Sequence, residues 1–240
     1  MQNTVVITGA GISVESGIQP FRGKNGLWNE NPTEMATNRN FRANTGTFLQ
    51  WYYHRFVSCK DALPNEAHHI LAKHQIKVVT QNIDNLHVKA GHPRHCLIEI
   101  HGNINFKRPI NATSKEALVL ANWNAVNEAQ LEVDLFDLFN IHPDGTIDDD
   151  ASYRPHILLF DEYYTELYQY NQALHWLDDA QTIIFMGTSN SVGFTYGALH
   201  EALQANKKII VVDPNPAPSF YQPGVEIVRQ TATEFCLAYF

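Results

Sequence analysis

The chain has 240 residues, 44% of them hydrophobic, and a formal net charge of −8 at pH 7. This length suits one large domain, or a domain with an insertion, and the hydrophobic content suffices for a core. The negative charge argues against a broad nucleic-acid-binding surface, and no apolar stretch reaches the roughly 18 residues that span a bilayer.

The three cysteines, Cys59, Cys96 and Cys236, are scattered and odd in number. This pattern favours a reducing compartment over a disulfide framework. The first expected strand begins a few residues after Met1, so we expect no signal peptide. The sequence therefore predicts a cytoplasmic protein, which we expect to be a monomer without nucleic-acid or membrane partners.

Short apolar runs recur along the chain and indicate strands buried on both faces. They are Thr4–Ile7, Lys77–Thr80, Cys96–Ile100, His156–Phe160, Thr182–Met186, Lys208–Val212 and Val225–Val228. Helical periodicity separates several of them, over Glu66–His74, Glu162–Ala180, Tyr196–Gln204 and Thr233–Tyr239. Strands alternating with helices predict an α/β fold with a doubly wound, parallel, Rossmann-like sheet.

Two stretches interrupt this alternation. Residues 22–75 carry an aromatic helix pattern over Thr47–Cys59, and residues 102–153 carry a helix-like pattern over Ser114–Phe139. We predict a single catalytic region over residues 1–240. Its large domain comprises about 1–21, 76–101 and 154–240, and two insertions, about 22–75 and 102–153, form a smaller domain. A cleft between the two domains would suit a dinucleotide and a second substrate.

The first expected strand runs into Gly9-Ala10-Gly11. Such glycines let a pyrophosphate approach the backbone N–H groups, beside the positive end of the next helix. A dehydrogenase fingerprint would have a third glycine at the position of Val14. It would also have an acidic residue at the end of a second strand, but the corresponding region of this chain, Gln19–Asn40, is a polar loop. The pattern indicates a dinucleotide site and argues against an ordinary dehydrogenase.

Polar side chains follow the next two strands. Gln81, Asn82 and Asp84 follow Lys77–Thr80, and amides and carboxylates there suit a carboxamide or ribose hydroxyls. Alternatively, Asn82 or Asp84 caps a helix. His101 ends the following strand, where it is either a general base or a structural residue.

Five blocks in order resemble the sirtuins, NAD-dependent protein-lysine deacylases. They are residues 9–18 with Phe21-Arg22, Thr80–His87, His101-Gly102, Arg154–Glu162 and Gly187-Thr188-Ser189. The resemblance implies that nicotinamide leaves NAD, that the acyl oxygen of an acylated protein lysine attacks the ribose, and that a ribose hydroxyl then attacks the alkylimidate. The products are nicotinamide and O-acyl-ADP-ribose.

The resemblance also implies roles for single residues. His101 would deprotonate the ribose hydroxyl, and Asn82 would join it in catalysis while holding the nicotinamide and ribose. The other NAD contacts would be Gly9, Ala10, Gly11, Phe21, Arg22, Gln81, Asp84, Gly187, Thr188, Ser189 and Asp213. Asp213 would accept ribose hydroxyls, although a turn residue is an equal interpretation. Leu158 and Phe160 would contact the acyl-lysine substrate.

Tyr52 and Arg55 are similar to the acyl-site pair of class III sirtuins. They lie three residues apart, hence on one helix face, and Arg with Tyr suits an acidic acyl group such as succinyl. The alternative is an aromatic core stripe beside a solvated arginine. Pro20 and Asp161 depart from the family pattern, and we expect these departures to alter the range of substrates and the rate of the reaction.

Most sirtuins hold zinc through four cysteines, but residues 102–153 contain none. We therefore predict no metal site and a zinc-free small domain. Its packing would come from Leu118, Leu120, Trp123, Val126, Leu131, Leu135, Phe136 and Leu138. Besides a deacylase, the sequence allows an NAD hydrolase or ADP-ribosyltransferase, or a non-catalytic NAD-binding module.

Overall fold

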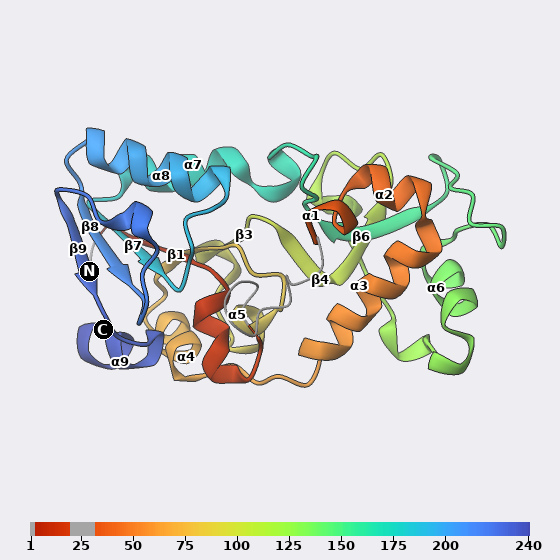
Figure 1. Cartoon of the computed structure of the whole chain (residues 1–240), viewed down its shortest axis with the longest axis horizontal. Coiled ribbons are helices and arrows are strands. Elements are labelled where there is room, and N and C mark those ends of the chain that lie inside the picture. The colour runs from red at the N-terminus through yellow and green to blue at the C-terminus, as the bar shows by residue number, and fades with distance from the viewer. Residues whose placement is uncertain (1–2, 20–31) are drawn as a thin grey trace.

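A computed structural model describes residues 3–19 and 32–240. Its main sheet has six strands in the order β3-β2-β1-β7-β8-β9 (Figure 1), and every neighbouring pair is parallel. The strands are β1 Thr4–Thr8, β2 Lys77–Thr80, β3 Leu97–Glu99, β7 Thr182–Met186, β8 Lys208–Val212 and β9 Val225–Val228. The predicted doubly wound parallel α/β sheet is confirmed.

Helices cover both faces of this sheet, with α7 and α8 on one face and α4 and α9 on the other (Figure 1). Their bounds are α4 Glu66–Lys73, α7 Tyr170–Asp179, α8 Gly193–Gln204 and α9 Ala232–Tyr239. Because successive strand residues point to opposite faces, Val5 and Ile7 pack with α7 and α8, whereas Val6 packs with α4 and α9. Burial on both faces explains the continuous apolar runs in the sequence.

The direction of the winding changes at β1, which stands between β2 and β7. In parallel α/β sheets such a reversal leaves a crevice at the carboxyl ends of the two strands, where ligands bind. Thr8 and Met186 are paired in register at these ends. The loops that follow β1 and β7 therefore emerge side by side, and both carry glycines that the sequence analysis selected.

A smaller unit lies beside the parallel sheet (Figure 1). It contains an antiparallel sheet in the order β5-β4-β6 and several helices. Their bounds are α1 Pro32–Met35, α2 Asn38–Ala43, α3 Thr45–Cys59, β4 Gly102–Pro109, β5 Val119–Leu120, α6 Leu131–Phe139 and β6 Tyr153–Ile157, while the short α5 Leu86–Lys89 follows β2. The core is aromatic, with Phe41, Phe48, Tyr52, Trp123 and Phe139 all buried.

The division into two domains stays a proposal, and two elements bear on its boundaries. Helix α4 comes from the segment assigned to the insertions, yet Ala67 and Leu71 pack with α9 on the parallel sheet. Strand β6 comes from the segment assigned to the large domain, yet it pairs with β4. Sequence position alone therefore does not decide to which sheet a segment belongs.

Two expected elements after residue 153 are wrong in extent. The expected strand His156–Phe160 lies earlier, because β6 ends at Ile157 and belongs to the antiparallel sheet. The expected helix Glu162–Ala180 begins only at Tyr170. Gln169, immediately before it, has a φ of 54°, a left-handed conformation that interrupts a right-handed helix.

The helix-like pattern over Ser114–Phe139 is also only partly correct. Short 3-10 turns and β5 occupy its first half, and α6 forms only over its last nine residues. Of the residues expected to pack the small domain, Trp123, Leu135 and Phe136 are buried, but Leu120 is 66% exposed. Leu120 lies on the edge strand β5, which pairs only with β4, so its side chain has little to pack against.

No helix in the described ranges is long and apolar enough to cross a membrane.

Candidate active site

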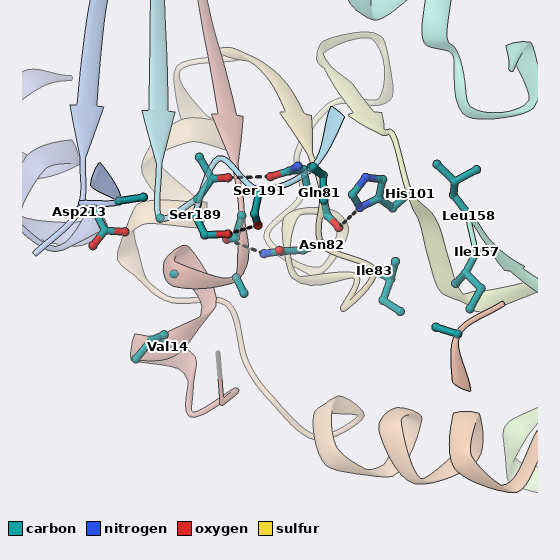
Figure 2. A pocket seen from close by; sticks show the side chains of 18 of the residues that line it. Val14, Gln81, Asn82, Ile83, His101, Ile157, Leu158, Ser189, Ser191 and Asp213 are labelled. Carbon is teal, nitrogen blue, oxygen red and sulfur yellow. Dashed lines mark hydrogen bonds between the residues drawn. The ribbon is translucent and has the colours of Figure 1, made fainter. Parts of the chain in front are cut away.

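The carboxyl ends of the parallel strands open into a cavity of about 890 Å³. Loops after β1, β2, β7 and β8 line one part of it, and α3 with the segment after β6 lines another. Figure 2 shows the strand ends above these side chains, with Asp213 toward one end of the cavity and Ile157 and Leu158 toward the other. Small-molecule sites generally have volumes of about 300–1,000 Å³, so there is room for a large ligand.

Three glycines bring the loops after β1 and β7 into backbone contact. The N–H of Gly11 donates to the carbonyl of Gly187 at 2.8 Å. A Cβ on Gly187 would lie 2.6 Å from the Cα of Gly11, and one on Gly9 would lie 2.7 Å from the Gly187 oxygen. Gly187 also has a φ of 60°, which glycine adopts without steric cost. These glycines, with Ala10, leave bare backbone along the cavity wall.

Hydroxyl and amide groups lie beside this wall, and Figure 2 shows the predicted Gln81 and Ser189 together with Ser191, which was not predicted. Thr188 donates its hydroxyl hydrogen to Oε1 of Gln81 at 2.9 Å. The hydroxyls of Ser189 and Ser191 are 2.6 Å apart. All four residues line the cavity. Together they offer donors and acceptors of the kind that ribose and phosphate oxygens require.

Asn82 is held rigidly at the end of β2. Its side-chain nitrogen donates to the Gly9 carbonyl at 3.0 Å and to the Ser13 hydroxyl at 3.1 Å. Its backbone N–H donates to the hydroxyl of Thr80 at 3.1 Å. Asn82 is only 4% exposed but lines the cavity. The amide therefore has one fixed orientation between the β1 and β2 loops.

Asp84 stands behind the cavity wall and is not one of its lining residues. One carboxylate oxygen accepts the Ser13 hydroxyl at 2.7 Å, and the other accepts the N–H of Leu86, the first residue of α5, at 3.0 Å. Burial raises the pKa of this carboxyl, and the two hydrogen bonds oppose the rise. This geometry matches the capping alternative, and direct cofactor contact by Asp84 stays a prediction. Asp84 is connected to the site indirectly, because it accepts the Ser13 hydroxyl hydrogen and the Ser13 oxygen accepts from the Asn82 side chain.

His101 lies in the cavity wall with both ring nitrogens hydrogen-bonded. Its Nδ1 lies 3.0 Å from the Gln81 carbonyl (Figure 2), and its Nε2 lies 2.9 Å from the Tyr164 hydroxyl. Burial lowers the pKa of His101 to about 4, against the opposing effect of the Gln81 carbonyl. The ring is therefore neutral at pH 7, as a general base must be. Gly102, with a φ of 89°, lets the next strand begin against the His156 carbonyl, where a Cβ would collide.

Asp213 follows β8 at the far end of the cavity (Figure 2). Its Oδ1 accepts the N–H of Asn215 at 2.8 Å. Burial raises the pKa of its carboxyl, and this hydrogen bond opposes the rise. Asp213 is thus a turn residue, as one interpretation expects, and also lines the cavity, as the other requires.

Tyr52 and Arg55 both line the cavity from α3. Tyr52 is fully buried, 5.9 Å from Trp123 between ring centroids, and its hydroxyl has no hydrogen-bond partner among the described residues. The guanidinium of Arg55 lies over the Trp51 ring, 5.6 Å from its centroid. Burial raises the pKa of Tyr52 and lowers that of Arg55. Tyr52 is therefore both part of the aromatic core and part of the cavity wall.

Leu158 and Phe160 line the cavity on the segment after β6. The N–H of Leu158 donates to the His101 carbonyl at 2.9 Å, and the N–H of Phe160 donates to the Ala36 carbonyl at 2.9 Å. The Phe160 residue is 51% exposed. The backbone of this segment is therefore joined both to the proposed base and to the small unit.

Two carboxylates fix the same segment. Glu162 binds the guanidinium of the buried Arg154 through both of its oxygens. Asp161 accepts the N–H groups of Asn38 at 2.6 Å and Arg39 at 3.0 Å, at the start of α2. Burial alone would raise the pKa of Asp161, but these N–H groups hold it below its usual value. Asp161 is thus the residue that ties this segment to α2.

The Sir2 family model matches residues 9–193. The chain belongs to the Sir2 family. The NAD-dependent protein deacylase of Bacteroides thetaiotaomicron is 29% identical over 239 residues, covering 98% of this chain and 94% of that protein. A solved complex of a mutant Sir2 homologue with ADP ribose is 26% identical with a TM-score of 0.80, covering 98% of this chain and 89% of that one. A solved Sir2 homologue–NAD complex is also 26% identical, with a TM-score of 0.75 and coverages of 98% and 86%.

Sir2 proteins use NAD, and the cavity of this Sir2 chain suits a dinucleotide. The bare backbone formed by Gly9, Gly11 and Gly187 is the kind of surface that a pyrophosphate approaches. Asp213 lies at one end of the cavity and His101 nearer the other. The residues present therefore fit NAD.

Three residues selected within the first Sir2 block, Pro20, Phe21 and Arg22, lie outside the described residues. The expected NAD contacts of Phe21 and Arg22 stay predictions. Within residues 3–19 and 32–240, no group of three or more His, Cys, Asp or Glu side chains could hold a metal ion. The zinc-free small domain likewise stays a prediction for this Sir2 chain.

Among the residues that sequence analysis did not select, Tyr164 and Ser13 bond directly to residues of the Sir2 site. The sequence places Tyr164 on a helix face, whereas the structure places its hydroxyl on His101, a residue 63 positions away. Ser13 joins Asn82 to Asp84, but its place in the first block gives it no stated role. Proximity to the glycines could have drawn attention to Ser13. No local pattern could have identified Tyr164, because its partner is distant in the chain.

Proposed function

We propose that this Sir2 protein removes acyl groups from protein lysine side chains, with NAD as co-substrate and nicotinamide and O-acyl-ADP-ribose as products. The observation that carries the proposal is the placement of a neutral, half-buried His101 in the same cavity as the glycine wall of Gly9, Gly11 and Gly187. That cavity continues to α3 and the segment after β6, which would receive the second substrate.

Different residues of the chain would bind different parts of the two substrates along the cavity. The backbone beside Gly11 would receive the pyrophosphate, while Gln81 and Asn82 would orient the nicotinamide ribose and carboxamide. His101 would be the base: its Nδ1 hydrogen is committed to the Gln81 carbonyl, which leaves Nε2, now bonded to the Tyr164 hydroxyl, as the acceptor nitrogen. Leu158 and Phe160 would position the acyl-lysine. Fixed groups of this kind lower the barrier by holding the reactants in place.

We further propose that the preferred acyl group is acidic, such as succinyl. Arg55 brings a cation to the cavity wall, and Tyr52 brings a buried hydroxyl without a partner among the described residues. A buried hydroxyl without a partner costs about 1–3 kcal/mol. A carboxylate that accepts from the tyrosine and pairs with the arginine would remove that cost, whereas an acetyl group would not reach both.

One observation favours a second candidate, NAD hydrolysis or ADP-ribosyl transfer. The N–H groups of Leu158 and Phe160 already donate to His101 and Ala36, and Asp161 is bound to α2. These backbone donors would have to be released before they could pair with an extended substrate. A water or a different acceptor would not need that rearrangement. A non-catalytic NAD-binding role is disfavoured because it does not require a neutral base in the cavity.

The deciding experiment measures nicotinamide release from NAD in three parallel reactions, with no peptide, with an acetyl-lysine peptide and with a succinyl-lysine peptide. Release that depends on a peptide, and is faster with succinyl-lysine, supports both parts of the proposal. Release without peptide points to the hydrolase or transferase. No release in any reaction would leave only NAD binding. The monomeric state, the cytoplasmic location and the lack of nucleic-acid partners remain predictions that sedimentation, fractionation and binding assays can check.

A further inference from the structure

The hydrogen bond between His101 and Tyr164 has a definite direction. A carbonyl oxygen can only accept, so the Nδ1 of His101 must donate to Gln81, 3.0 Å away. The Nε2 of the neutral ring is then an acceptor. The Tyr164 hydroxyl, 2.9 Å from Nε2, is therefore the donor. The lone pair with which His101 would act as a base is already occupied by a phenol hydrogen.

Tyr164 is firmly held in this position. Its ring stacks on the Tyr170 ring of α7, with centroids 5.2 Å apart. The centroid of the Phe194 ring of α8 lies 6.0 Å from that of Tyr164. Displacing the phenol from His101 would break these contacts. A substrate hydroxyl is therefore more easily accommodated beside Tyr164 than in its place.

The pair is neutral at pH 7. Burial lowers the pKa of His101 to about 4, and burial together with the nearby Tyr170 raises the pKa of Tyr164 to about 12. The phenol thus carries its hydrogen and the imidazole can accept one. Both residues line the cavity, so a ligand bound there would lie beside the pair.

We propose that Tyr164 is a further catalytic residue, which relays the proton of a substrate hydroxyl to His101. In the relay, the substrate O–H bond breaks and its proton bonds to the Tyr164 oxygen. The original Tyr164 proton moves to Nε2 of His101. The electron pair left on the substrate oxygen forms a bond to the alkylimidate carbon, whose π bond to nitrogen breaks as its electron pair moves onto that nitrogen. Tyrosine is regenerated as a neutral phenol and His101 becomes the imidazolium. The relay rests on the proposed function, which supplies a ribose hydroxyl as that substrate group.

The test compares wild-type protein with Tyr164→Phe, which keeps the stacked ring and removes only the hydroxyl. Tyr163→Phe is the matched control. It removes the same hydroxyl group from the adjacent residue, which is 87% exposed. Two rates are measured with an acyl-lysine peptide. Exchange of labelled nicotinamide into NAD reports the step before the base acts, and deacylated product reports the complete reaction.

For Tyr164→Phe we expect exchange within about twofold of wild type and product formation reduced about tenfold or more. Removing a donor to the neutral ring should also raise the pKa of His101, by about half a unit to one unit, in an NMR titration of isotope-labelled histidine. A purely structural role would instead lower exchange, product and thermal stability together. Tyr163→Phe should match wild type throughout.

Two further outcomes separate the relay from the proposed function. Undiminished or faster product formation in Tyr164→Phe, with exchange intact, overturns the relay alone, because the hydroxyl then reaches His101 directly. A wild-type protein that shows neither exchange nor product with any acyl peptide overturns the proposed function, and the relay with it.

Discussion

The N–H of Gly11 donates to the carbonyl of Gly187 across 2.8 Å, joining the loops that follow β1 and β7. Each glycine lacks the Cβ that would keep the two backbones apart. The contact lies where the strand order reverses, at the edge of the sheet where ligands bind. The same two residues therefore support the fold and form the wall of the cavity.

Gly187→Ala should destabilise the protein and weaken NAD binding. A methyl group there would lie 2.6 Å from the Gly11 Cα, and the φ of 60° disfavours alanine. We expect a loss of about 1–3 kcal/mol in the free energy of unfolding, measured by urea denaturation, and weaker NAD binding by calorimetry. Gly197→Ala, inside α8 with no neighbour within 4 Å, should be neutral or stabilising. Equal behaviour of the two variants would contradict this account.

His101→Ala should abolish turnover while largely preserving NAD affinity. The ring is the neutral acceptor in the cavity, and loss of a general base typically costs about 100-fold to 10,000-fold in rate. Steady-state deacylation and calorimetric NAD binding would be measured together. His175→Ala, on the exposed surface of α7, is the control and should behave as wild type. If NAD affinity fell as steeply as turnover, His101 would be a structural residue.

Arg55→Met should impair succinyl-lysine turnover far more than acetyl-lysine turnover. The variant keeps an apolar side chain over Trp51 but removes the cation from the cavity wall. A lost charge-assisted contact of about 1.5–3 kcal/mol corresponds to roughly a tenfold to hundredfold change in kcat/KM. Arg42→Met, which removes a surface pair with Asp149, should leave both activities unchanged. Equal losses with the two acyl groups would rule out the acidic-acyl proposal.

Three buried histidines should make the protein sensitive to acid. The rings of His68, His87 and His92 lie in a row, with successive centroids 4.8 and 5.6 Å apart. Burial lowers the pKa of each, that of His68 to about 3. Since an unfolded histidine titrates near 6.5, the unfolded chain binds more protons below that pH. We expect the free energy of unfolding to fall as pH drops from 7 to 5, by up to about 2 kcal/mol per histidine.

His68→Gln tests this proton linkage against His69→Gln, an exposed neighbour on α4. Urea denaturation at pH 7 and pH 5 gives the change in unfolding free energy for each protein. We expect a smaller change in His68→Gln than in wild type, whatever its absolute stability, and an unaltered change in His69→Gln. An identical pH dependence in all three would mean that His68 does not titrate on unfolding.

Local sequence patterns were sufficient to predict the parallel sheet and much of the site. Strands buried on both faces leave continuous apolar runs, as at Thr4–Ile7 and Thr182–Met186, which lie within β1 and coincide with β7. Gly11, Gln81 and His101 each follow or end a predicted strand, and the carboxyl ends of parallel strands meet at one edge, which explains why all three line one cavity. The Sir2 family followed from the same blocks.

The tertiary structure alone decided which distant groups meet. The apolar run after residue 153 indicates a strand, but only its pairing with β4 places it in the antiparallel sheet. Periodicity puts Tyr164 on a helix, yet its hydroxyl lies on His101, and Asp161 caps α2 from 122–123 positions away. Local patterns report burial and backbone preference, which depend on neighbouring residues. Hydrogen bonds between residues far apart in the chain depend on how the elements pack. Short-range periodicity does not contain information about that packing.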